Sequence, residues 1–326
     1  MKIFYAVQAT GNGHISRAME LLPHLGKYGE IDIFLSGNNA NLKLDAPIKY
    51  RSKGLSLYYT CTGKLNYVKI VRNINPLPLQ KEIKELPVEK YDLVINDYDY
   101  ITARACAAKK VPAVNFGHQA SFQSDNVPRP EKKSRIGEWM LKSFAPCERY
   151  IGLHFKEYDD FILTPVIKKE IIEAEPKSLG HITVYLPSYC EPQLVEIFSH
   201  FKRHRFEIFS RESSSINEQG HIKFMPVDKN LFNKSLINCD GIITGGGFET
   251  PSEAIHLGKK VMAIPIVGQY EQCCNAAALN EMNVMTLEKI NGNFKHDFEK
   301  WMNDYQPVQA DYSKTVERCM ERLFNS

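Results

Sequence analysis

Short apolar runs recur along this chain, and most are followed by a stretch whose apolar positions have helical spacing. In the first half, the runs that we predict to be strands are Lys2–Gln8, Ile31–Ser36, Leu93–Asn96, Ala113–Phe116 and Tyr150–Leu153. In the second half they are Ile182–Leu186, Phe206–Phe209, Ile222–Phe224, Gly241–Thr244 and Val261–Ile264. Strands that alternate with helices pair in parallel, with helices on both faces of the sheet. The pattern therefore predicts an α/β fold with two Rossmann-like, doubly wound parallel sheets.

A charged segment bounded by prolines separates the two sets of strands. It covers residues 164–177, TPVIKKEIIEAEPK, and contains Pro165 and Pro176. Exposed, proline-containing polar segments are typical of domain boundaries. We therefore predict an N-terminal domain over residues 1–163 and a C-terminal domain over residues 164–305. In doubly wound folds ligands bind at the carboxyl ends of the strands, so a cleft between the two sheets is the expected site.

The composition narrows the class of protein. With 326 residues, 43% hydrophobic and 24% charged, the chain has room for two globular domains. A net charge of +3 without a dense basic run argues against a nucleic-acid partner. The eight cysteines show neither a Cys-x-x-Cys pair nor metal-ligand spacing. We therefore expect reduced, mostly buried thiols, as in a cytosolic protein.

The first residues and the lengths of the apolar runs indicate where in the cell the protein is expected. Met1 and Lys2 lead directly into the first predicted strand, which leaves no room for a signal peptide. No apolar run approaches the length that spans a bilayer. We expect a cytoplasmic protein that at most lies on the inner face of the membrane.

Residues 240–279 carry the strongest functional signal. The predicted strand Gly241–Thr244 runs into Gly245, Gly246 and Gly247, and a helix begins close to Thr250. Glycines at such a turn let the backbone approach a ligand, and the free amides at the start of the helix favour a phosphate. A second polar cluster, made of Glu271, Gln272 and Asn275, follows the next strand. Glycines for a diphosphate, a carboxylate for ribose hydroxyls and a Glu-Gln pair for a sugar indicate a nucleotide-sugar site.

This block resembles the donor signature of GT-B glycosyltransferases, in both the MurG-like and the UDP-glucuronosyltransferase-like branches. The shared positions, in order along the chain, are Gly247, Thr250, Glu253, Gly258, Pro265, Glu271, Gln272, Asn275 and Ala276. The resemblance implies that the glycine turn and Thr250 hold the diphosphate. It also implies that Glu253 holds the ribose hydroxyls, and that Glu271 and Gln272 hold the sugar. It further implies that the final segment, residues 306–326, forms a helix that packs back on the N-terminal domain.

One departure from that signature concerns the diphosphate. Many plant and animal members have a histidine on it where this chain has Gly245. The simpler alternative for the whole block is a glycine-rich turn that is packed for its own sake. The Glu-Gln-x-x-Asn run that follows in the correct order favours the nucleotide-sugar site.

A second glycine turn follows the first strand. Gly11, Gly13 and His14 form a Gly-x-Gly-His sequence that opens a helix, without the third glycine of a dinucleotide fingerprint. We expect Gly11 and Gly13 to take part in donor binding. The sequence resembles the loop of MurG-like enzymes and the Gly-His turn of glucuronosyltransferases, where the histidine deprotonates the acceptor. An imidazole is suited to accept a hydroxyl proton near neutral pH. The alternative is that His14 only caps or orients the turn.

Acidic residues follow the strand Leu93–Asn96. By resemblance to glucosyltransferases, Asp97 would bond to the base histidine and stabilise its protonated form, as an aspartate does in a hydrolase triad. Asp97 and Asp99 also form the Asp-x-Asp pattern that chelates a metal in GT-A enzymes, although no GT-A context surrounds them. A third interpretation is that Asp97 caps the helix predicted over Thr102–Ala108.

Two further features lie on the acceptor side. His118 and Gln119 end a strand at the place where MurG-like proteins carry a His-Glu or His-Gln pair, so His118 is a second candidate for the base or an acceptor contact. A buried histidine with no catalytic role is the alternative. Residues 121–145 then combine lysines and arginines with Trp139, Met140 and Phe144. This segment would either dock on an anionic membrane or pack as an amphipathic helix on its own domain.

Together these features predict an inverting, metal-independent GT-B glycosyltransferase that uses a UDP-sugar and no other cofactor. Its predicted catalytic residues are His14 as base, Asp97 as its partner and His118 on the acceptor side. The acceptor hydroxyl, of a lipid, a polysaccharide or a small molecule, is left open, with cell-envelope polysaccharide or glycolipid synthesis as the expected setting. Two alternatives remain: a nucleotide-sugar 2-epimerase of the same fold, and a nucleotide-sugar-binding protein without turnover.

Overall fold

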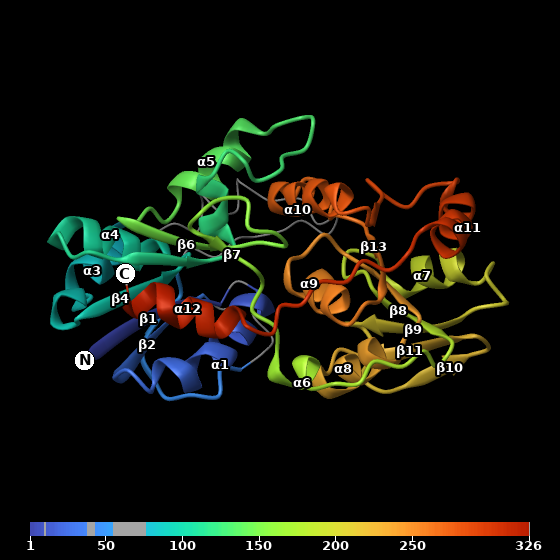
Figure 1. Cartoon of the computed structure of the whole chain (residues 1–326), viewed down its shortest axis with the longest axis horizontal. Coiled ribbons are helices and arrows are strands. Elements are labelled where there is room, and N and C mark those ends of the chain that lie inside the picture. Colours follow the sequence, from blue (N-terminus) through green and yellow to red (C-terminus); the bar gives the residue numbers. More distant parts are fainter. Residues whose placement is uncertain (10, 38–42, 55–75, 326) are drawn as a thin grey trace.

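Two parallel sheets with helices on their faces form two lobes side by side (Figure 1). The computed structural model describes residues 1–9, 11–37, 43–54 and 76–325. The first sheet has the strand order β3-β2-β1-β4-β5-β6-β7. Its strands are β1 (Lys2–Gln8), β2 (Glu30–Ser36), β3 (Ile48–Ser52), β4 (Leu93–Asp97), β5 (Val114–Gly117), β6 (Arg149–Leu153) and β7 (Ile162–Leu163).

The second sheet repeats this winding with the order β10-β11-β9-β8-β12-β13-β14. Among the described strands, only β10 and β11 pair antiparallel. The strands are β8 (His181–Tyr185), β9 (Arg205–Ser210), β10 (Asn217–Gln219), β11 (Ile222–Pro226), β12 (Gly241–Thr244), β13 (Lys260–Ala263) and β14 (Met285–Thr286). The predicted doubly wound α/β fold is therefore confirmed.

Every strand predicted from the sequence is present, and the strands that the sequence did not reveal lie towards the edges of the sheets. β3 is half exposed and β10 is fully exposed, so neither carries a continuous apolar run. β7 and β14 have two residues each, which is too short for a recognisable pattern. Central strands are buried on both faces and therefore stand out in a sequence, whereas edge strands do not.

Eleven α-helices cover the sheets in the part of the chain that the structure describes. They are α1 (Asn12–Leu25), α3 (Pro76–Glu85), α4 (Tyr100–Lys109), α5 (Arg135–Ser143), α6 (Lys169–Ile172), α7 (Glu191–Phe198), α8 (Lys229–Asn238), α9 (Glu249–His256), α10 (Tyr270–Glu281), α11 (Phe294–Asp304) and α12 (Thr315–Phe324). Short 3₁₀ turns occur at Val88–Lys90 and Gln119–Gln123. The last helix returns to the first lobe, where α12 packs against α1 and the Phe324 ring stacks on Tyr28 at 3.8 Å.

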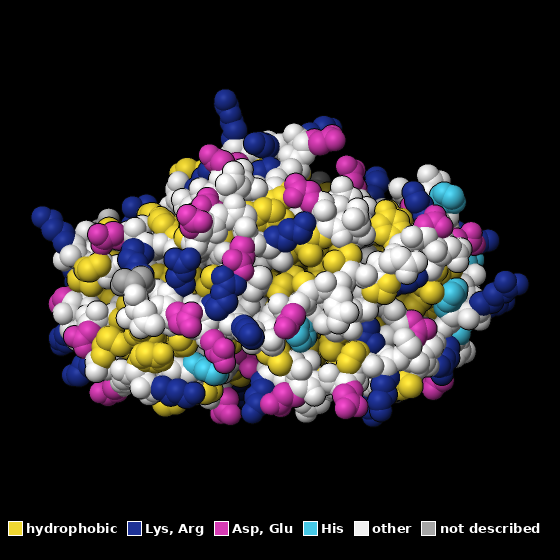
Figure 2. Space-filling view, in the orientation of Figure 1, with side chains coloured by type: hydrophobic (Ala, Val, Ile, Leu, Met, Phe, Trp, Pro, Cys, Tyr) yellow, Lys and Arg dark blue, Asp and Glu magenta, His cyan; other side chains and the backbone are white. Residues whose placement is uncertain are grey.

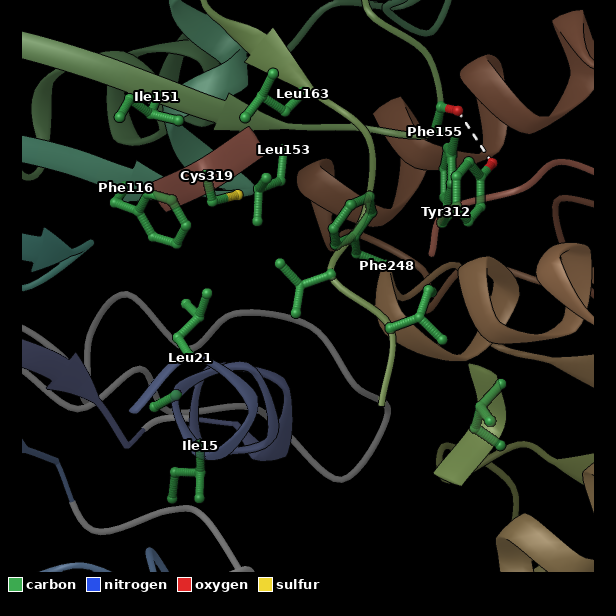
Figure 3. Packing of buried hydrophobic residues seen from close by; sticks show 14 of the residues in the cluster. Ile15, Leu21, Phe116, Ile151, Leu153, Phe155, Leu163, Phe248, Tyr312 and Cys319 are labelled. Carbon is green, nitrogen blue, oxygen red and sulfur yellow. Dashed lines mark hydrogen bonds between the residues drawn. The ribbon is translucent and has the colours of Figure 1, made fainter. Parts of the chain in front are cut away.

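An apolar cluster joins the two lobes beside the cleft (Figure 3). Phe248, just before α9, packs on Phe155 of the first lobe with ring centroids 5.2 Å apart. Tyr312, on the chain that leads to α12, donates its hydroxyl hydrogen to the carbonyl of Phe155 at 3.0 Å. All three side chains are buried, so separating the lobes here would expose apolar surface at a cost. The cleft is therefore bordered by a core that both lobes share.

The charged side chains on the surface and the state of the cysteines match what the composition predicts. Figure 2 shows side chains of both charges mixed over one face of the molecule. None of the described helices combines the length and apolarity needed to cross a bilayer. The cysteines in the described residues are all free thiols, and Cys61 lies outside those residues.

Candidate active site in the cleft between the sheets

A cleft of about 610 Å³ lies between the carboxyl ends of the two sheets. Most of the residues proposed from the sequence line it. From the first lobe these are Gly11, Gly13, His14 and His118, and from the second Gly247, Thr250, Glu253, Glu271 and Gln272. Asp97, Gly245, Gly246 and Asn275 are not among its lining residues. The cleft thus brings together two groups of residues that are more than a hundred positions apart in the chain.

His14 and Asp97 meet because their strands are neighbours. β1 and β4 pair in parallel with Val7 opposite Asp97, so the turn after β1 lies beside the end of β4. His14 lies in the first turn of α1, and its Nδ1 is 2.8 Å from Oδ1 of Asp97. The contact fixes the ring through Nδ1 and leaves Nε2 without a bonded partner among the described residues. A histidine held in this way can accept a proton on Nε2.

Asp97 is completely buried and is ionised. Burial alone raises the pKa of a carboxyl, but the Arg17 guanidinium and His14 together outweigh burial and hold the pKa of Asp97 below its usual value. Nη2 of Arg17 donates to both carboxylate oxygens, at 2.8 and 2.9 Å. Gly117 makes room for this contact, because a Cβ there would lie 2.7 Å from Oδ1 of Asp97.

Asp97 does not cap the helix that follows it, which was one of the sequence-based alternatives. The cap of α4 is Asp99, whose carboxylate accepts the amide hydrogen of Thr102 at 2.7 Å. Burial raises the pKa of Asp99. The two carboxylates of the Asp-x-Asp pattern are thus separately engaged, one with His14 and Arg17 and the other with the helix. Across the described residues, no group of three or more His, Cys, Asp or Glu side chains could hold a metal ion.

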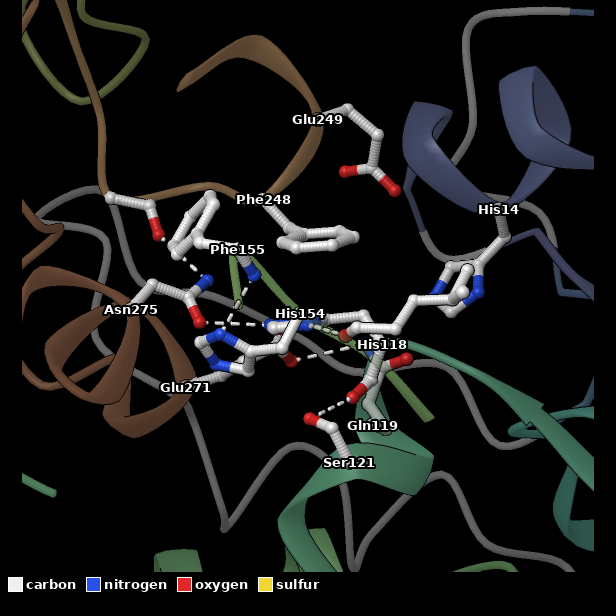
Figure 4. A network of polar contacts seen from close by, with 12 residues as sticks. His14, His118, Gln119, Ser121, His154, Phe155, Phe248, Glu249, Glu271 and Asn275 are labelled. Carbon is white, nitrogen blue, oxygen red and sulfur yellow. Dashed lines mark hydrogen bonds and ion pairs between the residues drawn. The ribbon is translucent and has the colours of Figure 1, made fainter. Parts of the chain in front are cut away.

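His118 is buried, and both of its ring nitrogens are occupied (Figure 4). Nδ1 lies 2.9 Å from the carbonyl oxygen of Leu153, and Nε2 lies 2.8 Å from Oδ1 of Asn275 in the other lobe. The ring also stacks on Phe248 with centroids 3.9 Å apart. Burial lowers the pKa of His118, although Glu271 opposes this. With no nitrogen open to the cleft, His118 is held as a contact between the lobes, whereas His14 has a free nitrogen.

Gly245, Gly246 and Gly247 form the turn between β12 and α9, which we call the donor turn because the sequence predicts that it holds the donor diphosphate. The three glycines differ in their surroundings. A Cβ on Gly247 would meet nothing within 4 Å, and this residue faces the cleft. A Cβ on Gly246 would lie 2.7 Å from the carbonyl oxygen of Gln272, so Gly246 is required for the turn to pack against α10. Asn275 supports the turn from behind, because it is fully buried and donates its amide hydrogen to the Gly246 carbonyl at 3.0 Å. Asn275, which the sequence placed in the donor site with Glu271 and Gln272, therefore holds the turn in place, and a contact of its own with the donor stays a prediction.

Glu253 faces the cleft from α9 but already has a cationic partner. Nζ of Lys168, in the segment between the sheets, lies 3.0 Å from Oε1 and 3.2 Å from Oε2 of this carboxylate. Glu253 is only 3% exposed, and burial raises its pKa while Lys168 lowers it. A ribose hydroxyl at this carboxylate would therefore share it with Lys168.

The Glu-Gln pair at the start of α10 is divided between two tasks. Glu271 reaches the first lobe, where it accepts a hydrogen from Nε2 of Gln119 at 3.2 Å. Gln272 uses its Oε1 to accept the amide hydrogen of Ile266 at 2.9 Å, so only its Nε2 remains for a ligand. Oε1 of Gln119 is buried and has no hydrogen-bond partner. These groups leave polar atoms available beside the donor turn.

Sequence reasoning missed two residues of this site, Arg17 and Glu249. Nη1 of Arg17 donates to Oε1 of Glu249 at 2.9 Å, which joins α1 to α9 across the cleft. Arg17 lies one helical turn after His14, so the i, i+3 spacing placed it on the same face. Nothing in the sequence indicated that Glu249, in the first turn of α9, would reach the other lobe. Lys168 was visible only as part of the charged segment between the domains.

Known proteins agree with this architecture. The sequence matches the family model for glycosyl transferase family 1 over residues 1–302. No curated protein sequence matches the chain. Among solved structures, MurG of Acinetobacter baumannii is 13% identical with a TM-score of 0.56, covering 100% of this chain and 99% of that one. Two further solved structures have similar identities and TM-scores.

UGT2 of Phytolacca americana, complexed with UDP-2fluoro-glucose and pterostilbene, is 12% identical with a TM-score of 0.58, covering 100% of this chain and 90% of that one. A UDP-N-acetylglucosamine 2-epimerase is 14% identical with a TM-score of 0.54, covering 100% and 96%. At these identities the likeness shows the fold alone. It confirms the GT-B arrangement predicted from the sequence.

Proposed function

Because the chain belongs to glycosyl transferase family 1, we propose that it moves a sugar from a UDP-sugar to a hydroxyl acceptor, inverting the anomeric carbon without a metal ion. The acceptor oxygen attacks the anomeric carbon as its proton passes to Nε2 of His14. The bond between that carbon and the diphosphate oxygen breaks, and UDP leaves with the electron pair. One displacement with one base requires no covalent intermediate.

The single observation that carries this proposal is the His14–Asp97 pair. A buried, ionised aspartate holds Nδ1 of the histidine at 2.8 Å, and Nε2 is left for a substrate hydroxyl in a cleft that both lobes line. Asp97 stabilises the imidazolium that forms when the proton arrives. A nucleotide-sugar-binding protein without turnover has no need of such a pair.

The donor is proposed to bind on the second lobe. The open backbone at Gly247 and the free amides at the start of α9 favour the diphosphate, and Thr250 adds a hydroxyl beside them. Fixed donors of this kind stabilise the charge that develops on the leaving group. We assign Glu253 to the ribose, and Glu271 together with Nε2 of Gln272 to the sugar.

The test compares the two histidines. We expect His14→Ala to lower turnover by about 10²–10⁴-fold, the usual contribution of a general base, while UDP affinity measured by calorimetry stays near that of wild type. Asp97→Asn should give a smaller loss. His118→Ala should retain more turnover than His14→Ala, because His118 holds the lobes together and has no nitrogen free for a proton. A fully active His14→Ala together with an inactive His118→Ala would show that the wrong histidine had been assigned.

The products separate the proposed reaction from its rivals. Transfer releases UDP with each sugar moved to an acceptor, whereas 2-epimerisation returns a nucleotide sugar with the nucleotide still attached. Incubation of the purified protein with UDP-sugars and acceptors of the three classes, followed by chromatography, distinguishes these outcomes. Recovery of an epimerised donor would favour the epimerase, and an unchanged donor with every acceptor would favour a binding protein.

We further propose that α5 lies against an anionic membrane surface, which would suit a lipid acceptor. Ile136 and Trp139 on this helix are 57% and 59% exposed, and Lys132, Lys133 and Arg135 are exposed beside them. Aromatic and aliphatic side chains next to cations bind anionic interfaces. Trp139→Ser should reduce co-sedimentation with vesicles of phosphatidylglycerol and phosphatidylcholine, while Leu179→Ser, a control at a distant exposed position, should not. Equal sedimentation of wild type and Trp139→Ser would refute this docking.

A further inference from the structure

The base is connected to the donor lobe by a chain of charged groups. His14 contacts Asp97, and Arg17 binds Asp97 and also lies 3.0 Å from Nδ1 of His14 through its Nη2. Arg17 is in turn bound by Glu249, the first residue of α9. The Arg17 side chain is only 2% exposed and that of Glu249 is 29% exposed, so the Arg17–Asp97 contact is buried and the Arg17–Glu249 contact is partly buried. Three of the four residues belong to the first lobe, and Glu249 alone comes from the second.

The approach of Glu249 to the first lobe depends on a glycine. A Cβ on Gly13 would lie 2.5 Å from the carboxyl atoms of Glu249, so any larger residue would push the carboxylate away. Gly13 lies in the first turn of α1, one residue before His14. A glycine at this place in the Gly-x-Gly-His sequence thus has a local reason that differs from contact with a phosphate. It admits a carboxylate from the opposite lobe.

A count of charges shows what Glu249 adds. Arg17 binds Asp97 through both oxygens, so the negative charge that should stabilise a protonated His14 is already balanced. With Asp97 and Arg17 alone, protonation of His14 would give this buried cluster a net charge of +1. With Glu249 included, the cluster has a net charge of −1 before the proton arrives and zero afterwards. Uncompensated buried charge is strongly disfavoured, so the second state accepts the proton more readily.

The other ionisable groups around the cluster do not change this count. Tyr5 and Cys319 are its neighbours in the first lobe, and burial raises the pKa of both, that of Cys319 to about 12. Both are therefore neutral at physiological pH. Burial lowers the pKa of Arg17, but Asp97 and Glu249 together outweigh this and raise it, so the guanidinium stays charged. Glu249 also interacts with His118 and Glu253 on its other side. Burial lowers the pKa of His118, which keeps it neutral, and the Glu253 carboxylate is paired with Lys168, so neither adds net charge.

Resting on the transfer reaction proposed above, we infer that Glu249 and Arg17 are positioning residues that make His14 an effective base only when the donor lobe is seated against it. Glu249 supplies the balancing charge, and it lies two residues after Gly247 of the turn to which we assign the diphosphate. A base that depends on a group from the donor lobe is weak while the lobes are apart. Premature deprotonation of water or acceptor is thereby disfavoured.

The experiment uses charge-neutral substitutions in the full-length protein. Glu249→Gln keeps an oxygen for Arg17 and removes the negative charge. We expect the acid limb of the pH–rate profile to move to lower pH by about half a unit to one unit. The shift is small because Glu249 acts on His14 from the far side of Arg17 and not by direct contact. Turnover at the plateau should fall by at most about tenfold, since a base weakened by up to one pKa unit slows proton transfer by no more than that factor. UDP affinity should be retained.

The decisive arm is a rescue. In Arg17→Gln combined with Glu249→Gln, the cluster regains its original net charge of −1, so the acid limb should return towards that of wild type. A purely structural role predicts the opposite, because a second lesion would add to the first. Gly13→Ala, which displaces the Glu249 carboxylate without removing it, should reproduce the shift of Glu249→Gln. The control is Glu157→Gln, which breaks an ion pair with Arg318 away from the cleft.

A readout without turnover separates this inference from the proposed function. Histidine-selective ¹⁵N NMR follows the protonation of the His14 ring directly, with His14→Ala used to assign its signals. The titration midpoint should move to lower pH in Glu249→Gln and recover in the double variant, whether or not an acceptor is known. Superimposable titrations of wild type and Glu249→Gln would overturn the inference. Absence of transfer by the wild type with the expected NMR shifts would overturn only the proposed function.

Discussion

The assignment of Glu253 to the ribose can be tested with one isosteric substitution. Glu253→Gln keeps the size of the side chain and one carbonyl oxygen but removes the charge. In the structure the carboxylate is 3% exposed and is bound by Nζ of Lys168 at 3.0 Å. Lys168 also donates to Oδ1 of Asn233 at 3.2 Å, and its side chain is 14% exposed. The lysine therefore retains a partner and some access to water, so the variant should fold.

The size of the effect follows from what the hydroxyl loses. A hydrogen bond to a charged group contributes about 1.5–3 kcal/mol, and one to a neutral group about 0.5–1.5 kcal/mol. Lys168 already binds both carboxylate oxygens, so the gain for a hydroxyl should lie towards the lower end. We therefore expect Glu253→Gln to weaken UDP binding by about 1–2 kcal/mol, which is about 5–30-fold in Kd.

Calorimetry with UDP and 2′-deoxy-UDP provides the assay. Wild type should prefer UDP by a similar factor, and the preference should shrink to about twofold in Glu253→Gln, because the group that senses the hydroxyl has lost its charge. The control is Glu207→Gln, an ion-paired carboxylate on β9 that is not among the lining residues of the cleft. An unchanged preference for UDP over 2′-deoxy-UDP in Glu253→Gln would refute the ribose assignment, even if overall affinity fell.

Two further outcomes follow from the same geometry. Glu271→Ala should weaken a UDP-sugar about 5–150-fold, the effect of about 1–3 kcal/mol, and leave UDP within about twofold; equal losses for both would place Glu271 on the nucleotide. His154 is fully buried and its pKa is lowered well below the usual value, first by burial and then by His118 and Arg129, so the unfolded chain binds the proton more readily. Stability should therefore fall as pH drops below about 6.5, by up to about 1.4 kcal/mol per pH unit for this residue, and His154→Phe should flatten the curve of Tm against pH between 7 and 5. Parallel curves for the two proteins would contradict this origin of the acid sensitivity.

The sequence predicted those parts of the site that lie on one stretch of chain. The turn at Gly247, the cleft-facing Thr250 and the carboxylate of Glu253 all belong to one strand–turn–helix unit, so local spacing was enough to place them. The same holds for His14, which opens the helix after β1. Its contact with Asp97 needed one more step, the adjacency of β1 and β4, which the doubly wound order supplies. Short-range pattern and fold class together account for these residues.

The choice between the two histidines could not be made in that way. Each lies in the helical turn that follows a strand, His14 in the first turn of α1 after β1 and His118 at the start of the 3₁₀ turn after β5, so local sequence does not distinguish them. The two histidines differ in their hydrogen-bond partners. Both ring nitrogens of His118 are bonded, one to Leu153, 35 residues away, and the other to Asn275, 157 residues away in the other lobe. No periodicity in a single chain encodes such a distance. The same limit hid Glu249, whose partner Arg17 is 232 residues away.

Three of the contacts that escaped prediction share one feature, because each joins the two lobes. Arg17 with Glu249, His118 with Asn275 and Gln119 with Glu271 all cross the cleft, and each pair has one member on α9 or α10. Those two helices also frame the donor turn at Gly247, so movement of the donor lobe changes all three contacts together. A ligand that seats this turn against the first lobe would thus close the contacts around both histidines at once. If the proposed function holds, the charge on Glu249 therefore reaches a base on the opposite side of the cleft through one of these pairs.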